Sequence, residues 1–445
     1  MRWMNWKSYL AYKKRRFADD RKIRICRATS KVCTSKVRID VKKLYKVLIA
    51  LSKYRLNKVD RMVKNMIKLG DVATYINGYA FKPKDRSKRG LPIIRIQDLT
   101  GNSYDLGFYD GTYPQKIEIN DGDVLISWSA SLGVYIWNRG KALLNQHIFK
   151  VEFDKADIDK NYFVFAVRHK LKEMGRKTHG ATMKHIVKKD FESTEIPYPS
   201  YEKQVEIATN LNKIFRIIES RNKELQLLDE LIKARFVELF GDPANNEKGF
   251  IKAPMGDYMT LLTDFSSNGS YKTLDSRVTM YDEPKYAWMV RTTDLESGDM
   301  TSVKYIDESA YELLSRSKIY GGEIIMNKIG SAGKIYLMPQ INMPASLGRN
   351  AFMFRYDEHI NVKFLYHLLT SEYGQREIQQ YVRGAVTKTI TKNDARSVLI
   401  IVPPIELQNE FEVFVAQVDK SKSAIEKELK KTQILFDSLM QKYFG

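Results

Sequence analysis

Cysteine and long apolar runs are scarce in this 445-residue chain, and each scarcity excludes a class of protein. The two cysteines, Cys26 and Cys33, have six residues between them, which fits neither a disulfide framework nor a C-x-x-C pair. A reducing cytoplasm is therefore the expected compartment. Because no stretch of about 18 apolar residues occurs, we expect no membrane span. The N-terminus is basic but has no apolar core of a signal peptide, so we expect no secretory signal.

Motifs of known catalytic centres are also missing. A phosphate-binding loop ending at Gly333-Lys334 would need a glycine where Lys328 stands. The pair Pro403-Pro404 lacks the polar and aromatic neighbours of an adenine methyltransferase motif, and no G-x-G-x-x-G, G-x-S-x-G or H-E-x-x-H occurs. The six histidines show no metal-ligand spacing: His147, His169, His179, His185, His359 and His367. We therefore expect no catalytic residue, metal or cofactor on this chain.

The net charge of +21 lies almost entirely at one end of the chain. Residues 1–68 contain 22 of the 74 Lys and Arg but only four of the 53 Asp and Glu. The remainder is nearly neutral, so an argument for nucleic-acid binding there must rest on local clusters. Residues 1–66 are interpreted as a basic N-terminal extension, either an arm that contacts phosphates or an accessory segment.

Two stretches of the chain carry apolar residues in steps of four and three, which predicts long helices with a heptad seam. They are 204–241 and 408–445, they align without a gap at an offset of 204, and both end in Phe-Gly. Arg221, Arg235, Lys422 and Thr432 interrupt the apolar pattern and are expected to fix the register. The predicted seam is Ile207, Leu211, Ile214, Ile218, Leu225, Leu228, Ile232, Leu239, Phe411, Val415, Val418, Ile425, Leu429, Phe436, Leu439 and Tyr443.

A globular part precedes each long helix. Short runs rich in β-branched and aromatic residues alternate with Gly and Asn turns, and helices are expected at 162–174 and 364–378. This pattern predicts an α+β fold with two mixed domains in tandem, each followed by one of the long helices. The expected boundaries are 67–200 for the first domain, 201–243 for the central helix, 251–403 for the second domain and 404–445 for the C-terminal helix.

Several motifs occur in both halves in the same order. Leu69-Gly70-Asp71 opens the first domain, and the runs 94–99 (IRIQDL) and 290–295 (VRTTDL) correspond. So do 121–133 and 321–333, and the segments 179–186 (HGATMKHI) and 383–390 (RGAVTKTI). Their order and duplication resemble the specificity subunit of type I restriction–modification enzymes, over residues 67–445. Residues 1–66 are longer than the usual lead-in of that family.

The resemblance implies a fold, a function and a set of partners. The two long helices would lie antiparallel and form a coiled coil that separates the two α+β domains. Each globular domain would recognise one half of a split sequence in double-stranded DNA. One copy of the chain would hold two modification (methyltransferase) subunits and, where they are present, two restriction subunits. S-adenosylmethionine, ATP and magnesium would then bind to those partners and not to this chain.

The predicted helices also suggest how half-site spacing is set. A helix of about 37 residues spans roughly 55 Å, which corresponds to about 16 base pairs of B-DNA. Helix length would then act as a ruler, as dimer geometry does in other DNA-binding proteins. The outer faces of the helices, including Glu219, Lys223 and Lys233, are left as expected docking surface for the modification subunits.

Candidate DNA-binding residues are basic, amide and hydroxyl side chains in loops and at strand ends, since these types read phosphates and base edges. In the first domain they are Lys82, Lys84, Arg86, Lys88, Arg89, Arg95, Gln97, Ser127, Trp128, Ser129, Arg176, Lys177, Thr182, Lys184 and His185. In the second domain they are Tyr271, Lys272, Arg291, Thr293, Asn327, Lys328, Ser331, Arg383, Thr387, Lys388 and Thr389.

Structural interpretations of the same residues stay open. The basic loop 82–89 fits a solvated loop equally well, and Arg95 fits an ion pair with Asp98. Arg95, Gln97 and Asp98 are expected to end a strand, and 176–185 is expected to be a loop. Two other functions compete with DNA recognition: a coiled-coil scaffold with duplicated protein- or RNA-binding domains, and a fused enzyme such as a nuclease.

Overall fold

The computed structural model describes residues 65–101, 105–177, 185–298 and 301–445. The predicted N-terminal extension therefore lies outside the described residues, except for its last two. The chain divides into two compact units. The first contains the chain up to Ile218 together with Lys431–Gly445, and the second is Glu219–Lys430. Each long helix thus contributes to both units.

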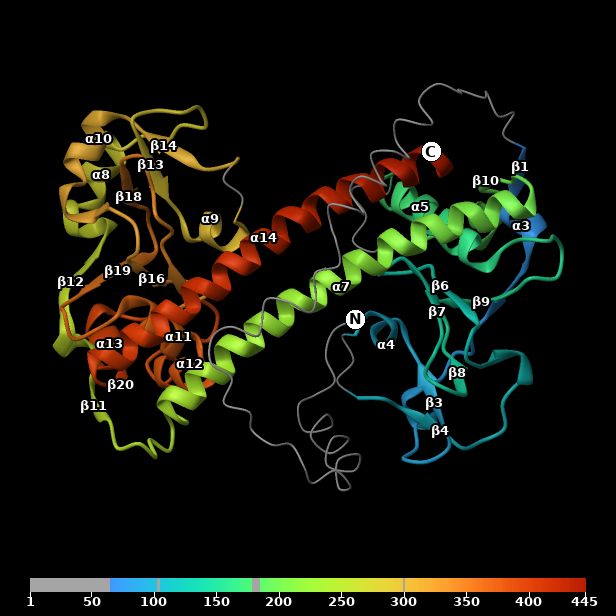
Figure 1. Ribbon diagram of the computed structural model, residues 1–445, viewed down its shortest axis with the longest axis horizontal. Helices are drawn as coiled ribbons and strands as arrows, with labels where there is room; N and C mark the ends of the chain where they lie inside the picture. The colour runs from blue at the N-terminus through green and yellow to red at the C-terminus, as the bar shows by residue number, and fades with distance from the viewer. Residues whose placement is uncertain (1–64, 102–104, 178–184, 299–300) are drawn as a thin grey trace, which may run out of the picture. The chain divides into compact units, whose positions relative to one another are not determined.

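Two four-stranded sheets form the globular part of the first unit (Figure 1). One has the strand order β2-β9-β6-β7 with every pair antiparallel, and the other has the order β4-β3-β8-β5 with β3 and β8 parallel. The central strand β6 is buried along its whole length, which explains its continuous apolar run. The strands are β2 (Thr74–Asn77), β3 (Leu91–Ile94), β4 (Phe108–Tyr109), β5 (Glu118–Ile119), β6 (Val124–Ser127), β7 (Gly133–Ile136), β8 (Ala142–Leu144) and β9 (Ile148–Glu152).

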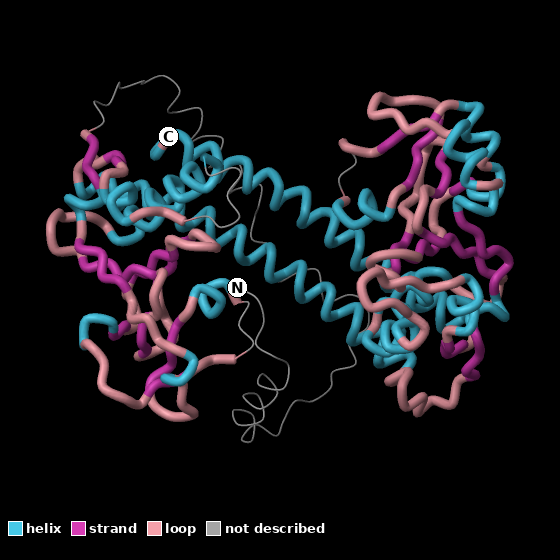
Figure 2. Tube along the Cα trace, turned by 180° about the vertical axis from the view of Figure 1, so that it is seen from behind, coloured by secondary structure: helices cyan, strands magenta, loops and turns pink. Residues whose placement is uncertain are grey.

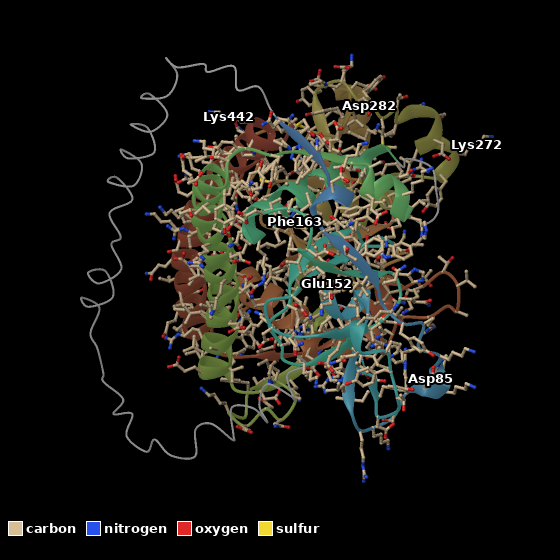
Figure 3. The ribbon with its side chains drawn as sticks, turned by 90° about the vertical axis from the view of Figure 1, so that its right-hand side faces the viewer. Asp85, Glu152, Phe163, Lys272, Asp282 and Lys442 are labelled. Carbon is tan, nitrogen blue, oxygen red and sulfur yellow. The ribbon has the colours of Figure 1, made fainter. Side chains whose placement is uncertain are left out.

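A strand pair and four helices complete this unit. β1 (Met66–Lys68) and β10 (Glu195–Pro197) pair antiparallel, so the start and the end of the domain meet. The helices are α3 (Leu69–Val72), α4 (Ile96–Thr100), α5 (Lys160–Lys177) and α6 (Lys188–Glu192). Phe163 of α5, labelled in Figure 3, is fully buried.

The second unit repeats this plan strand for strand. Its sheets have the orders β12-β19-β16-β17 and β14-β13-β18-β15, again with one parallel pair, β13 and β18. Its strands, magenta in Figure 2, are short and joined by extensive loops. They are β11 (Ile251–Pro254), β12 (Met259–Asp264), β13 (Ala287–Val290), β14 (Lys304–Ile306), β15 (Lys318–Ile319), β16 (Ile324–Asn327), β17 (Ile335–Leu337), β18 (Ala345–Leu347), β19 (Ala351–Tyr356) and β20 (Leu399–Val402). The helices are α8 (Tyr271–Arg277), α9 (Thr292–Ser297), α10 (Glu308–Leu313), α11 (Val362–Thr370), α12 (Glu372–Gln379) and α13 (Lys392–Ser397).

The two long helices are α7 (Tyr201–Phe240) and α14 (Ile405–Phe444), each of 40 residues. Both start just after proline, and Gly241 ends α7 in the left-handed conformation (φ 72°), which glycine adopts without strain. In the first unit Phe215 of α7 packs on Phe436 of α14, with 6.0 Å between ring centroids. In the second unit Lys422 of α14 forms an ion pair with Asp229 of α7 at 2.6 Å. These contacts pair early residues of one helix with late residues of the other, so within each unit the helices run antiparallel.

Burial along the predicted seam is uneven. Its buried members are Ile207, Leu211, Ile214, Ile218, Ile232, Leu239, Phe411, Val415, Val418 and Phe436. The half-buried members, such as Leu225 and Ile425, lie mostly near the middle of the helices. Phe236 and Phe240, outside the predicted seam, are also buried because they pack on Phe364 of α11, with ring centroids 5.7 and 4.6 Å away. α7 therefore buries a second apolar stripe, against α11 of the second domain.

A buried glutamine near the start of each long helix joins it to its own domain. The Gln204 side chain accepts a hydrogen bond from the backbone of Asp159 at 2.9 Å and donates to Pro199 at 2.9 Å. Gln408 accepts from the backbone of Asn361 at 2.8 Å and donates to Pro403 at 2.8 Å. The glutamine that recurs at the offset of 204 residues thus satisfies backbone groups where helix and domain meet.

None of the helices in the described ranges is both long and apolar enough to cross a membrane.

Candidate nucleic-acid interface

In each unit a loop that follows the central strand meets a segment far away in the sequence. After β6, Trp128 donates its backbone N–H to His147 at 3.3 Å, and its carbonyl accepts from Ile186 at 2.9 Å. After β16, Lys328 donates to Asn350 at 2.7 Å and accepts from Ile390 at 3.1 Å. These bonds bring Trp128, which follows β6, beside His185 in the first unit. In the second unit they bring Lys328, which follows β16, beside Thr389.

The first turns of α4 and α9 carry an arginine–aspartate pair. The Asp98 carboxylate accepts from the backbone N–H of Arg95 at 2.8 Å and from its Nε at 3.0 Å. Asp294 accepts from the same atoms of Arg291, at 3.2 and 3.1 Å. Both aspartates are buried. The ion pair between Arg95 and Asp98, expected above as the alternative role of Arg95, is therefore present. Arg291 and Asp294 form the same pair in the second unit.

The expectation that these residues end a strand is wrong. β3 ends at Ile94, and α4 begins at Ile96 because Asp98, at the third helical position, accepts from the residue before the helix. Gly101, with φ 77°, then ends the helix after one turn. Gln97 and Thr293 are exposed on the first turns of α4 and α9.

A cavity of about 400 Å³ opens in the second unit beside α9. Four of the candidate residues line it, namely Arg291, Thr293, Asn327 and Ser331. The rest of its wall mixes apolar and polar side chains: Phe265, Val278, Met280, Met289, Thr292, Glu296, Ile329, Gly348, Arg349 and Asn350. Its size is that of a small-ligand pocket.

One wall of the cavity is a short hydrogen-bond chain. Asn327, which is 6% exposed, donates from Nδ2 to the Tyr336 hydroxyl at 3.4 Å. Tyr336 donates to Glu296 at 3.2 Å, and Glu296 also pairs with Lys334. Burial, and then the charge of Glu296, raise the pKa of Tyr336 to about 12, so its hydroxyl remains a donor at neutral pH. Asn327 is therefore held in place from behind.

A buried carboxylate holds two lysines at the end of β12. Asp264 is 4% exposed and lies 3.0 Å from the Nζ of Lys328 and 2.8 Å from that of Lys392. Burial alone would raise the pKa of Asp264, but the hydrogen bonds from Lys392, Ser267 and Lys328 outweigh it and hold the pKa well below its usual range. The candidate Lys328 is thus held in an ion pair, and the two lysines and the aspartate together carry a net charge of +1.

Replacing Asp264 with asparagine is expected to lower the stability of the second unit at pH 7 by about 1–3 kcal/mol. A depressed pKa contributes stability above the ordinary carboxyl value of about 3.9, and this is lost as the pH falls below it. The variant should therefore lose less stability than the wild type between pH 5 and pH 3. Hydrogen exchange of β12 and β19 measures both effects.

Asp282→Asn is the control, because Asp282 pairs with Lys304 at the surface, where an ion pair adds little, and Figure 3 shows Asp282 at the outer edge of the unit. Equal hydrogen exchange in Asp264→Asn and the wild type at pH 7 would contradict the predicted role of Asp264.

The basic loop of the first unit is open to solvent. Its five candidate cations are all exposed: Lys82, Lys84, Arg86, Lys88 and Arg89. Asp85 ends the short 3-10 helix η1 (Pro83–Asp85) and accepts from the backbone of Lys82 at 2.6 Å; Figure 3 shows Asp85 at the edge of the molecule. The geometry fits both phosphate contact and simple solvation.

The remaining candidates of the second unit are exposed. Tyr271 and Lys272 lie in the first turn of α8, and Figure 3 shows Lys272 directed outward. Arg383 and Thr389 exchange backbone hydrogen bonds of 2.9 and 2.8 Å and close a hairpin that presents Thr387 and Lys388. The Arg383 side chain is 75% exposed and lies 3.1 Å from Asp394.

The last candidates of the first unit follow or end α5. Arg176 and Lys177 were expected in a loop, but α5 continues to Lys177 and includes both. Thr182 and Lys184 lie outside the described residues. His185 is exposed, and its ring lies 4.7 Å from that of Trp128, edge to face.

Sequence reasoning missed several residues at these sites. His147 and Asn350 occupy equivalent turns in the left-handed conformation (φ 70° and 65°), and their carbonyls hold the loops after β6 and β16. The left-handed region is uncommon for residues other than glycine, and asparagine tolerates it best. Arg349 lines the cavity, but the comparison of the two repeats could not identify it as a candidate, because the first domain has Gln146 at the matching position.

Three ligand-type side chains gather elsewhere in the second unit. Asp357, Glu358 and His359 place one ligand atom each within 4.8 Å of one another. Glu358 and His359 are exposed and Asp357 is half-buried, and His359 Nδ1 is 3.2 Å from Asp357. Exposed acidic groups commonly lie this close without a metal, so the absence of a metal site stays a prediction.

The chain resembles several known proteins. Residues 63–230 and 262–434 match the family model of the type I restriction modification DNA specificity domain. The type I restriction enzyme EcoBI specificity subunit of Escherichia coli is 25% identical over 400 residues, which are 84% of this chain and 83% of that protein. The MjaVIII specificity subunit of Methanocaldococcus jannaschii is 25% identical over 342 residues, 71% of this chain and 78% of the relative. The crystal structure of the type I S subunit from M. genitalium shares the fold, with a TM-score of 0.52 and 15% identity over 87% of this chain and 98% of that one.

Proposed function

Because the chain belongs to the family of type I restriction–modification DNA specificity subunits, we propose that its two globular domains read the two halves of a bipartite target in double-stranded DNA. The observation that carries this proposal is the duplication itself. Two domains with the same sheet order, 67–200 and 251–403, present different side chains at matching places. Where the first has Trp128 and His147, the second has Lys328 and Asn350. Equal scaffolds with unequal surfaces suit two different half-sites.

The candidate residues fit a division of labour between positioning and reading. Exposed cations such as Lys88, Lys272 and Lys388 suit phosphate contacts, which fix orientation but carry no sequence information. Exposed Gln97 and Thr293, on the first turns of α4 and α9, suit base edges. Arg95 and Arg291 are committed to Asp98 and Asp294. Their first role in this proposal is to hold those turns.

The long helices are the proposed docking surface for two modification subunits, with one copy of this chain in each complex. Charged residues such as Glu219 and Lys233 are exposed there. So are apolar side chains that a monomer has no need to expose: Leu227, Leu231, Val237, Val413 and Ile434. S-adenosylmethionine would bind to these partners, and ATP and magnesium to restriction subunits where those are present.

The test is to purify the full chain together with its methyltransferase subunits and to sequence the modified DNA by a single-molecule method. We expect adenine methylation in one split motif. Deletion of the gene should remove that motif from the methylated motifs of the host, and no other. A genome whose methylated motifs are all unchanged by the deletion would refute the proposal.

A further inference from the structure

An apolar side chain stands at the tip of the hairpin 383–389 in the second unit. Val386 is 98% exposed, the highest value among the exposed large apolar residues of the described chain. The hairpin is well defined, because Arg383 and Thr389 exchange two backbone hydrogen bonds. Gly384 makes the turn possible, since it has φ 106° and a Cβ there would lie 2.2 Å from the Thr387 carbonyl oxygen. A built turn that presents valine to water suggests an apolar contact made only with a partner.

The hairpin is fixed to the rim of the cavity beside α9. Gly330 donates its N–H to the carbonyl of Lys388 at 2.9 Å, and Ile329 bridges to Thr389. Ile329 and Ser331 from that same loop line the cavity. The exposed valine and the cavity are therefore parts of one surface.

The cavity combines apolar walls with polar side chains, of which Asn327 is the most buried. Phe265, Val278 and Met289 supply apolar surface, which suits the faces of a flat ring. Asn327 donates one amide N–H to Tyr336, and among the described residues no group donates to its Oδ1. This leaves a carbonyl oxygen and a second N–H, the pair of groups with which asparagine recognises adenine.

The depth of Asn327 decides how a base can reach it. The residue is 6% exposed, so its amide cannot extend into the groove of an intact duplex. A base that has left the stack can enter a pocket instead, as it does in enzymes that act on single bases. Proteins that unstack DNA often insert an apolar side chain at the step they open. Exposed Lys388, beside Val386 and with no acidic partner among the described residues, suits the phosphate at such a step.

We propose that Val386 inserts into the base stack of the second half-site and that the cavity beside α9 takes up the base it displaces, with the Asn327 amide on the edge of that base. This inference rests on the proposed function, because it assumes that the second domain binds DNA. It assigns a nucleobase to a site that would otherwise be only a surface hollow.

The test uses the full chain assembled with its methyltransferase subunits and duplexes that carry 2-aminopurine. This base is placed in turn at every position of the second half-site on both strands, apart from the methyl-acceptor adenines. Its fluorescence rises when it leaves the stack. At saturating protein we expect a several-fold rise at one position, and no rise outside the acceptor adenines would overturn the proposal.

Substitutions connect that signal to the two features. Val386→Ser should abolish the rise and weaken DNA binding about tenfold, whereas Val386→Leu should preserve both. Ser331→Trp, at the mouth of the cavity, should also abolish the rise, while Ser131→Trp, the matching change in the first domain, should not. Because Val386 is fully exposed, its replacement leaves the fold intact. A fluorescence rise that survives Val386→Ser or Ser331→Trp would overturn the proposal. If the complex then still methylated the same split motif, the proposed function would stand although this inference had failed.

Discussion

Replacing Phe236 with alanine is expected to destabilise the second unit by about 3–5 kcal/mol, a large part of the stability of a typical domain. The side chain is 6% exposed on the C-terminal half of α7. Its ring lies 4.8 Å from Phe240, 5.5 Å from Phe411 of α14 and 5.7 Å from Phe364 of α11. Truncation therefore opens a hole where three helices meet, and the rigid aromatic neighbours cannot close it.

The neighbouring residue on the same helix provides the control. Val237 is 56% exposed, so Val237→Ala is expected to change stability by no more than about 0.5 kcal/mol. Urea unfolding gives the size of the effect, and hydrogen exchange in α11 and in the last turns of α7 gives its location. If the amides of these segments are as well protected from hydrogen exchange in Phe236→Ala as in Val237→Ala, the second apolar stripe does not hold helix and domain together.

Phe236 also shows where sequence reasoning about the helices ends. The heptad pattern correctly predicted two long helices with an apolar seam, because it depends only on which residues share a face. Their antiparallel direction was implied by the family resemblance. The pattern could not show that α7 meets α11 as well as α14, since the second contact depends on how the domain folds against the helix. The α+β class and the tandem repeat were predicted correctly for a similar reason. Repeated motifs in a repeated order require a repeated fold.

The candidate interface was less accessible from sequence. Arg95 and Asp98 were recognised as a motif, but a strand end and a one-turn helix share the same apolar run before them. The cavity draws its lining from separate segments between Phe265 and Asn350. No pattern along the chain indicates that Asn327 and Arg349 meet there. The sequence therefore indicated which residue types could contact DNA, but which of them meet on one surface depends on the tertiary structure.

Adding one heptad to both long helices is expected to abolish methylation of the original motif while leaving both half-site sequences unchanged. α7 and α14 each continue from one unit into the other, with the division at Ile218 and Glu219 in α7 and at Lys430 and Lys431 in α14. Seven residues inserted at these points add roughly 10.5 Å of helix, which corresponds to about three base pairs. They keep the apolar seam nearly in phase, because seven residues are close to two helical turns.

The helical twist of DNA makes this effect large. Each added base pair turns the second half-site by about 34° around the duplex axis, whereas the added heptad turns the helices by only about 20°. A longer gap therefore also presents the second half-site from another side, and any motif that is still methylated should have a gap about three base pairs longer. Sequencing of the methylated DNA measures gap and half-sites together, and a variant in which the same heptad replaces existing residues is the matched control. Full methylation at the original spacing would show that helix length does not set the distance between the two readers.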